Sequence, residues 1–115
     1  MNDIIKYFRD LPGDENIFTP ISLQFAICKE FNIEENDLLS KCRKQQIINA
    51  RRLYFYILKT VFKMGWTEIG LKTGFDHSTI IYSYRKCEDI LVTEERYLDI
   101  ANNILIGLRN GKIKL

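Results

Sequence analysis

Apolar side chains recur every three or four residues along most of the chain, which is the spacing of one face of an α-helix. No stretch alternates apolar and polar residues as a half-buried strand would, and glycine and proline are scarce, at six and two residues. A chain of 115 residues, 46% of them hydrophobic, has enough apolar side chains for one packed core. The pattern therefore predicts a single all-α domain.

Capping and helix-breaking residues divide this pattern into helices. Thr19-Pro20 is a hydroxyl cap followed by a first-turn proline, Gly65 and Gly74 interrupt the pattern, and Thr93 precedes an acidic first turn. We expect helices over roughly 20–31, 37–40, 45–62, 66–71, 76–91 and 94–108. In the first of them, the residues expected to face the core are Ile21, Phe25, Cys28 and Phe31. The expected boundaries are an N-terminal arm at 1–18, a helical domain at 19–110 and a C-terminal tail at 111–115.

Residues 65–91 have the outline of a helix-turn-helix. A short helix is followed by a glycine-containing turn of about four residues and then by a longer helix. That longer helix begins with the polar run Asp76-His77-Ser78-Thr79. One capping side chain would satisfy a helix start, so the additional polar groups favour a surface that contacts a ligand. In this motif the N-terminal residues of the second helix enter the major groove of DNA, where they meet the donors and acceptors of base edges.

Positive charge is concentrated in the middle of the chain. Residues 41–87 hold 10 Lys and Arg against 2 Asp and Glu, whereas residues 1–40 hold 3 against 8 and residues 88–115 hold 4 against 5. The basic block therefore includes the helix-turn-helix. Although the formal net charge is only +2, such a segregated distribution attracts polyanions such as nucleic acid. A solubilising, lysine-rich surface is the alternative interpretation.

Four short motifs occur in an order and at a spacing known from one protein family. They are Asp37-Leu38-Leu39-Ser40-Lys41, Ala50-Arg51-Arg52, Glu68-Ile69-Gly70 and Asp76-His77-Ser78-Thr79-Ile80. Through them, nearly the whole chain resembles the C-terminal DNA-binding domain of the bacterial replication initiator DnaA. The resemblance implies an all-α, six-helix fold like that of the Trp repressor, with the helix-turn-helix at 65–91. It also implies sequence-specific binding of double-stranded DNA, in replication initiation or its regulation.

The resemblance further implies roles for individual residues. Arg43, in the basic loop before the long helix, matches an arginine that family members insert into the minor groove. Arg51 and Lys59 match basic residues that hold phosphates, and Thr67 falls where the family makes further backbone contacts. Contacts to bases and adjacent backbone in the major groove are implied for Asp76, His77, Ser78 and Thr79. We expect Asp76 to cap its helix as well.

Helical geometry brings the cations of the long helix together. At about 100° per residue, Arg52 and Lys59 are about 20° apart, and Arg51 and Lys59 about 80° apart. The three are therefore expected to form one stripe opposite the buried face. The aromatic residues around them have helical spacing and are expected mostly in the core rather than stacked on bases: Tyr54, Phe55, Tyr56, Phe62 and Trp66. Cys87 is expected to be an inert core residue.

The chain departs from the family pattern just before the polar run. Gly74-Phe75 stands where the pattern has Gly-Gly-Arg, so the arginine ahead of Asp76 is missing and the segment is one residue shorter. Ser78 replaces a threonine, which removes a methyl group that could contact a thymine methyl. We therefore do not expect the recognised sequence to be identical to the initiator's binding box.

Other functional classes find little support in the sequence. There is no nucleophile–base set, and three cysteines with one histidine make no credible metal site, so we expect no enzymatic activity, cofactor or metal. No GxxxxGK[ST] phosphate loop is present, which predicts a reader of DNA without an ATPase domain or bound nucleotide. No apolar run reaches the roughly 18 residues of a membrane span, and we expect a cytoplasmic protein.

A protein-interaction module is the alternative function. Such a module would keep the fold without reading DNA sequence, and the missing arginine and the near-neutral net charge favour it. The acidic arm at 1–18 is the segment expected to contact any protein partner.

Overall fold

The computed structural model describes residues 19–109, and all secondary structure within them is helical. The helices are α2 (Pro20–Phe31), α3 (Glu35–Leu38), α4 (Gln45–Thr60), α5 (Trp66–Thr73), α6 (His77–Thr93) and α7 (Glu95–Arg109). The all-α prediction is confirmed, and the observed helix ends lie within one turn of the predicted ones. The arm predicted at 1–18 and the tail predicted at 111–115 lie outside the described residues.

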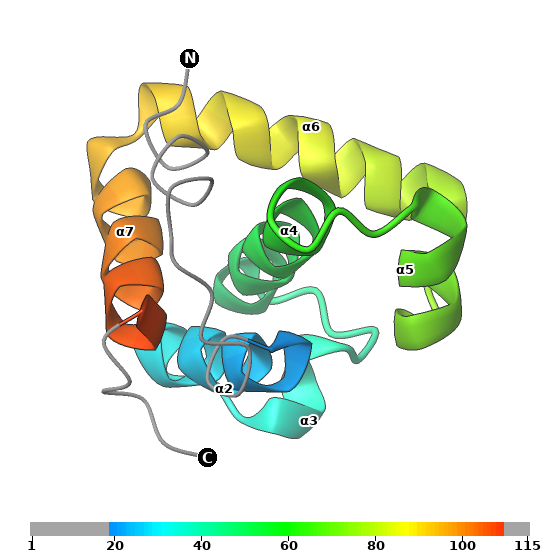
Figure 1. Ribbon diagram of the computed structural model, residues 1–115, viewed down its shortest axis with the longest axis horizontal. Coiled ribbons are helices and arrows are strands. Elements are labelled where there is room, and N and C mark those ends of the chain that lie inside the picture. The colour runs from blue at the N-terminus through cyan, green and yellow to red at the C-terminus, as the bar shows by residue number, and fades with distance from the viewer. Residues whose placement is uncertain (1–18, 110–115) are drawn as a thin grey trace.

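Helix α4 is the centre of the domain (Figure 1), and it packs against α2, α3, α5 and α6. From Leu53 to Leu58 every side chain is at most 1% exposed. A helix that is apolar on all sides over such a stretch belongs inside a domain rather than on its surface. As a consequence, α4 has only a narrow exposed face, and not all of its cationic side chains can lie on it.

The aromatic side chains in α4 and just after it form part of the core, as predicted. Tyr54, Phe55 and Tyr56 are fully buried, while Phe62 and Trp66 are partly buried and pack against the core. Stacking and edge contacts link them to the helix-turn-helix: the ring of Tyr84 in α6 stacks on Tyr56 at 5.2 Å and meets the edge of Trp66 at 5.3 Å. These contacts attach α5 and α6 firmly to α4.

The two fully or nearly buried thiols of the core are unreactive packing groups. Burial raises the pKa of Cys87 to about 12 and that of Cys28 to about 11. A thiol with so high a pKa holds almost no thiolate at neutral pH, which is the form that reacts. Cys87 is a buried core residue, as predicted.

Helix α2 begins and ends as its sequence predicts, but it turns a different face to the core. Thr19 and Ser22 form a capping box, and Asn32 closes the helix in the left-handed conformation at φ 54°. Two residues predicted to be buried are exposed: Ile21 is 56% exposed and Phe25 36%. Cys28 and Phe31 are buried as predicted, and Leu23, Ala26 and Ile27 make up the rest of the core face. Helix α2 carries more apolar residues than one face needs, so the periodicity left its orientation ambiguous.

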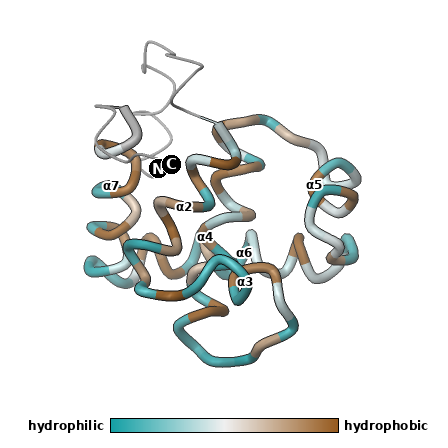
Figure 2. Tube along the Cα trace, turned by 90° about the horizontal axis from the view of Figure 1, so that it is seen from below, coloured by the Kyte–Doolittle hydropathy of each residue, from teal (hydrophilic) through white to brown (hydrophobic). Residues whose placement is uncertain are grey.

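Helix α7 runs from the end of α6 toward α2 (Figure 1), contacts both helices and closes the core with Tyr97, Ala101, Ile104 and Leu105. Hydrophobic and hydrophilic segments alternate around its turns (Figure 2), as expected for a helix with one buried face. The hydroxyl of Tyr97 donates a hydrogen bond to the carbonyl of Asn49 at 2.7 Å, which ties α7 to α4. Among the described residues, none of the helices is both long and apolar enough to cross a bilayer.

Candidate nucleic-acid interface

The turn between α5 and α6 depends on two glycines. Gly74 has φ +82°, a left-handed conformation that ends α5 and that side chains with a Cβ rarely adopt. A Cβ placed on Gly70 would lie 3.0 Å from the carbonyl oxygen of Phe75, so any larger residue would require this backbone atom to shift. The Glu68-Ile69-Gly70 motif therefore has a structural reason: it allows α6 to start close against α5.

Helix α6 starts with a side-chain cap, as predicted. The carboxylate of Asp76 accepts a hydrogen bond from the backbone N–H of Thr79 at 2.8 Å and another from the hydroxyl of Ser78 at 3.1 Å. The hydrogen bond from the Thr79 backbone is the main reason that the pKa of Asp76 is lowered, with smaller contributions from the Thr79 and Ser78 side chains and from the charge of Lys41. Asp76 is therefore ionised at neutral pH and locks the first turn.

The side chains at the tip of α6 are accessible. His77, Ser78 and Thr79 are all exposed, and Thr79 also borders an open hollow on the same side of the molecule. None of these residues is required by the core, because the first buried residue of α6 is Ile80. The side chains of the polar run 76–79 are thus exposed on the surface of the domain, as the composition of the run predicted.

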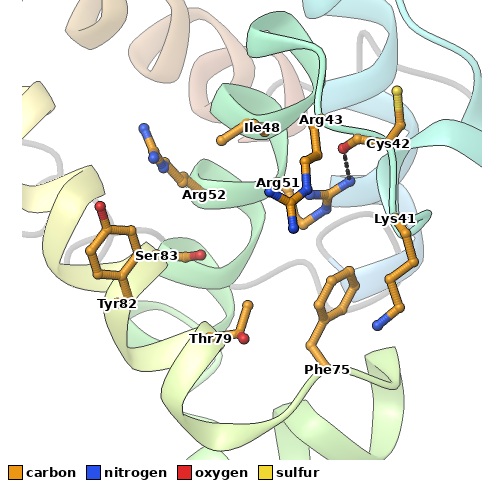
Figure 3. Close-up of a pocket in the computed structure, with 10 residues that line it drawn as sticks. All are labelled: Lys41, Cys42, Arg43, Ile48, Arg51, Arg52, Phe75, Thr79, Tyr82 and Ser83. Atoms are coloured by element: carbon orange, nitrogen blue, oxygen red, sulfur yellow. Dashed lines mark hydrogen bonds between the residues drawn. The ribbon is translucent and has the colours of Figure 1, made fainter.

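The hollow next to this tip has a volume of about 490 Å³ and is strongly cationic. Its walls come from the loop between α3 and α4, from α4 and from α6 (Figure 3). The lining residues are Lys41, Cys42, Arg43, Ile48, Arg51, Arg52, Phe75, Thr79, Tyr82 and Ser83. Four of them are Lys or Arg and none is Asp or Glu. We call this surface, together with the tip of α6, the basic groove.

The loop of the basic groove presents exposed cations. Lys41 and Arg43 are exposed, and Arg52 on α4 is half-buried. The loop and α6 are far apart in sequence, yet they form opposite sides of one hollow (Figure 3). The structure therefore brings Arg43 and Thr79, two residues singled out in the sequence, to the same surface.

Arg51 is buried and does not belong to the exposed stripe of cations that was predicted for α4. It is only 9% exposed, and its Nε donates a hydrogen bond to the carbonyl of Leu38 at 2.8 Å. Its Nη2 donates to the carbonyls of Ser40 at 2.6 Å and Cys42 at 3.2 Å. Burial lowers the pKa of this guanidinium, but arginine remains charged at neutral pH. Arg51 thus forms the floor of the basic groove and holds the adjacent loop.

Lys59 and Thr67 lie away from the hollow. The Lys59 ammonium sits 4.4 Å from the centre of the Trp66 ring, a cation–π contact that links the end of α4 to the start of α5. Thr67 is exposed in the first turn of α5, whose N-cap Gly65 has no side chain to accept the free amides. Lys59 and Thr67 therefore lie near the start of α5 and outside the basic groove.

Tyr82 and Ser83 belong to the lining of the hollow but were not singled out in the sequence. Tyr82 is 56% exposed, and the Lys86 ammonium lies 5.8 Å from the centre of its ring. Thr79, Tyr82 and Lys86 are three and four residues apart, so helical spacing from Thr79 would have placed all three on one face.

The described residues contain no group of three or more His, Cys, Asp or Glu arranged to hold a metal ion.

Fold and surface together define a helix-turn-helix domain with a cationic groove beside the exposed tip of its second helix. Comparison with known proteins gives the family: residues 21–87 match the model described as the bacterial dnaA protein helix-turn-helix. Because this match covers more than half of the chain, the chain belongs to that family. The family is defined by a helix-turn-helix and not by a catalytic centre, which agrees with the expectation of no enzymatic activity.

Individual relatives extend the similarity over nearly the whole chain. The chromosomal replication initiator protein DnaA of Thermodesulfovibrio yellowstonii is 36% identical over 90% of this chain and 24% of its own length. The proteins of the same name from Campylobacter curvus and Borrelia turicatae are 31% and 30% identical over 99% and 96% of this chain. In these two the match covers 23% and 22% of the relative's own length. The chain therefore spans about a quarter of the curated relatives it matches.

Proposed function

We propose that this domain binds double-stranded DNA with sequence preference, in replication initiation or its regulation. The tip of α6 enters the major groove, where His77 contacts base edges and Asp76, Ser78 and Thr79 contact bases or the adjacent backbone. Arg43, on the exposed loop at the other side of the basic groove, reaches the neighbouring minor groove. The observation that carries the proposal is the continuity of this surface, on which exposed polar groups of α6 adjoin the loop cations.

The electrostatics of this surface fit a duplex. Arginine is favoured in narrow minor grooves because the negative potential is strongest there. The N-terminus of α6 adds the positive end of its helix dipole next to the groove, which suits phosphate. We propose that Lys59 and Thr67 add backbone contacts at the start of α5, and that Arg51 adds positive charge from the floor.

The number of cations sets the strength expected for this binding. With three or four phosphate contacts, the logarithm of the binding constant should fall with the logarithm of salt concentration with a slope of about −3 to −4. This is a modest electrostatic attraction. Affinity for random DNA should therefore be weak, and base contacts should decide where the domain binds.

One observation favours the alternative of a protein-interaction module. Phe75 occupies the position where the resembled pattern has an arginine, and its half-buried ring lies under Lys41 and Arg51 instead of extending toward a ligand. The surface thereby has one cation fewer at the tip of α6. In this alternative the fold is kept and the groove binds an acidic protein segment.

Selection from a pool of random duplexes at low salt separates the two functions. If the proposal holds, an enriched sequence appears, and the purified protein binds it more tightly than a scrambled duplex of equal length. If no sequence is enriched and all duplexes bind equally weakly, sequence-specific recognition is contradicted and the interaction module becomes the better account.

The proposal concerns DNA reading by this domain. The 115-residue sequence holds no GxxxxGK[ST] motif, so we propose that this binding requires no nucleotide. Because the family is bacterial and the proposed ligand is DNA, the proposal implies a cytoplasmic protein. At constant ionic strength and constant Mg²⁺ concentration, added ATP should leave the affinity for the selected duplex unchanged.

A further inference from the structure

Arg51 is bound to the loop that carries Lys41 and Arg43. Its guanidinium donates hydrogen bonds of 2.6–3.2 Å to the carbonyl of Leu38, at the end of α3, and to the carbonyls of Ser40 and Cys42 in the loop. The planar guanidinium of arginine presents five N–H donors in a rigid arrangement, whereas lysine has three donors on one rotatable ammonium. These carbonyls lie one to five residues before Arg43, so the place of Arg43 on the surface depends on the bonds that Arg51 makes.

The same guanidinium contacts the turn of the helix-turn-helix. Its central carbon lies 5.1 Å from the centre of the Phe75 ring, and the Lys41 ammonium lies 4.8 Å from that centre (Figure 3). Phe75 is the residue immediately before Asp76, the cap of α6. The Phe75 ring is in turn held by an edge contact with the buried Phe55, at 5.5 Å and 71°. Loop and turn are therefore joined through one aromatic ring and two cations.

We infer that Arg51 and Phe75 are positioning residues that fix the loop of Lys41 and Arg43 relative to the tip of α6. The inference rests on the proposed function, since it assigns to this link the spacing between the minor-groove and major-groove contacts. A fixed spacing lowers the ordering cost of binding, because the loop does not have to be immobilised when DNA arrives. It also makes binding selective for duplexes whose two grooves have that spacing.

The identity of residue 75 fits this role. An arginine at this position would place a third cation beside Lys41 and Arg51, and like charges at such distances repel one another. A phenylalanine instead offers both cations the negative face of its ring. The departure from the family pattern therefore removes one cation from the tip of α6. In return, the phenylalanine stabilises the arrangement of the basic groove.

Hydrogen–deuterium exchange on the DNA-free protein tests the link without reference to DNA. The reporters are the amides of Ser40 and Cys42, which are bonded within the loop to the Asp37 carbonyl and the Ser40 hydroxyl. In Phe75→Leu, loss of the cation–π contacts should speed their exchange about tenfold. Phe75→Tyr keeps a ring face and should restore slow exchange.

A control separates this local effect from general destabilisation. Ile104→Val removes one methyl group from the core in α7, away from the groove, and it should leave the loop exchange unchanged at temperatures well below unfolding. Equal loop exchange in wild type and Phe75→Leu would overturn the inference, as would an increase in Ile104→Val of the same size. If Phe75→Leu does not fold, Arg51→Lys serves instead, because it keeps the charge and loses the planar fork.

DNA binding supplies the second readout. Phe75→Leu should lower the ratio of affinities for the selected and scrambled duplexes about fivefold to tenfold, with an unchanged salt slope, because no phosphate contact is removed. Fast loop exchange with an unchanged ratio would overturn the positioning role. If the wild type selects no sequence, the proposed function fails, whereas the exchange experiment still decides whether loop and turn are joined.

Discussion

Asp76 combines two properties that can be measured apart from any ligand. Its carboxylate caps α6, and the hydrogen bond from Thr79 lowers its pKa below the ordinary value of 3.8. A group whose pKa is lower in the folded state stabilises the fold above its unfolded pKa and loses that contribution as the pH falls through the folded value. We therefore predict that Asp76→Ala melts at a lower temperature than the wild type at pH 7.

This difference in melting temperature should narrow as the pH is lowered below 3.8, because the wild-type carboxylate then becomes protonated. Thermal unfolding followed by circular dichroism between pH 7 and pH 2.5 provides the measurement. Asp76→Asn is the matched control: it keeps an acceptor for the Thr79 amide and removes the titrating group. A difference that stays constant with pH would show that the charge of Asp76 does not stabilise the cap.

His77 is the residue whose loss should affect sequence preference most. Because its exposed side chain contacts base edges in the proposed complex, His77→Ala should cost about 1–3 kcal/mol of binding free energy on the selected duplex. Affinity for a scrambled duplex should change little. Fluorescence anisotropy on both duplexes measures this, with Leu71→Ala as the control, since Leu71 is 84% exposed on α5 and has no proposed contact. Equal losses on both duplexes would contradict base reading by His77.

The approach of α5 to α6 depends on Gly70. A Cβ at this position would lie 3.0 Å from the Phe75 carbonyl, a backbone atom that can move only if the turn moves. We predict that Gly70→Ala lowers the free energy of unfolding by about 1–3 kcal/mol, the usual cost of overpacking. Urea unfolding measures this directly.

Gly65→Ser is the control for this substitution. The space around Gly65 is open within 4 Å, and serine is a favourable residue at the N-cap of α5. Gly65→Ser should therefore be neutral or stabilising. If Gly70→Ala were as stable as the wild type, the close approach of the two helices would not depend on glycine.

The end of α4 should contribute charge but no sequence preference. We predict that Lys59→Ala weakens binding to selected and scrambled duplexes alike and makes the salt slope less steep by about one unit, because one phosphate contact is lost. Salt titrations of binding to both duplexes provide the measurement. Lys29→Ala removes the same charge from the exposed surface of α2 and should leave the slope unchanged. A change confined to the selected duplex would contradict the backbone role of Lys59.

Helix positions could be predicted because their ends are encoded locally. Thr19, Gly65, Gly74 and Asp76 act on the adjacent turn, and each lies where its chemistry predicts. The buried face of α2 was less predictable, because Ile21 and Phe25 compete with a second apolar face and only the packing of α4 and α7 decides between them.

The floor of the basic groove could not be predicted from local sequence. Periodicity places Arg51 near exposed cations, whereas its burial depends on carbonyls of a loop 9–13 residues earlier in the chain. The position of the Phe75 ring likewise depends on α4, through Phe55. Both positions depend on tertiary contacts. The exposure of the polar run of α6 could be predicted because it does not depend on such contacts.

The domain as a whole brings the tip of α6 and the cations of the loop before α4 together beside a core centred on α4. The tip of α6 comes from one part of the sequence and the loop cations from another, and the fold joins them across a hollow of about 490 Å³. Helices α2 and α7 supply other parts of the surface. A duplex bound as proposed should therefore affect the loop and the tip of α6 together and leave α2 and α7 unaffected.

Titration of the ¹⁵N-labelled protein with the selected duplex, followed by NMR, tests this arrangement most directly, since the chain of 13.6 kDa suits the method. The predicted result is that amides at residues 41–44 and 76–79 shift together, with further shifts around Lys59 and Thr67 and with the amides of α2 and α7 unchanged. Shifts centred on α2 or α7, or shifts at only one of the two segments, would contradict a continuous DNA-binding surface.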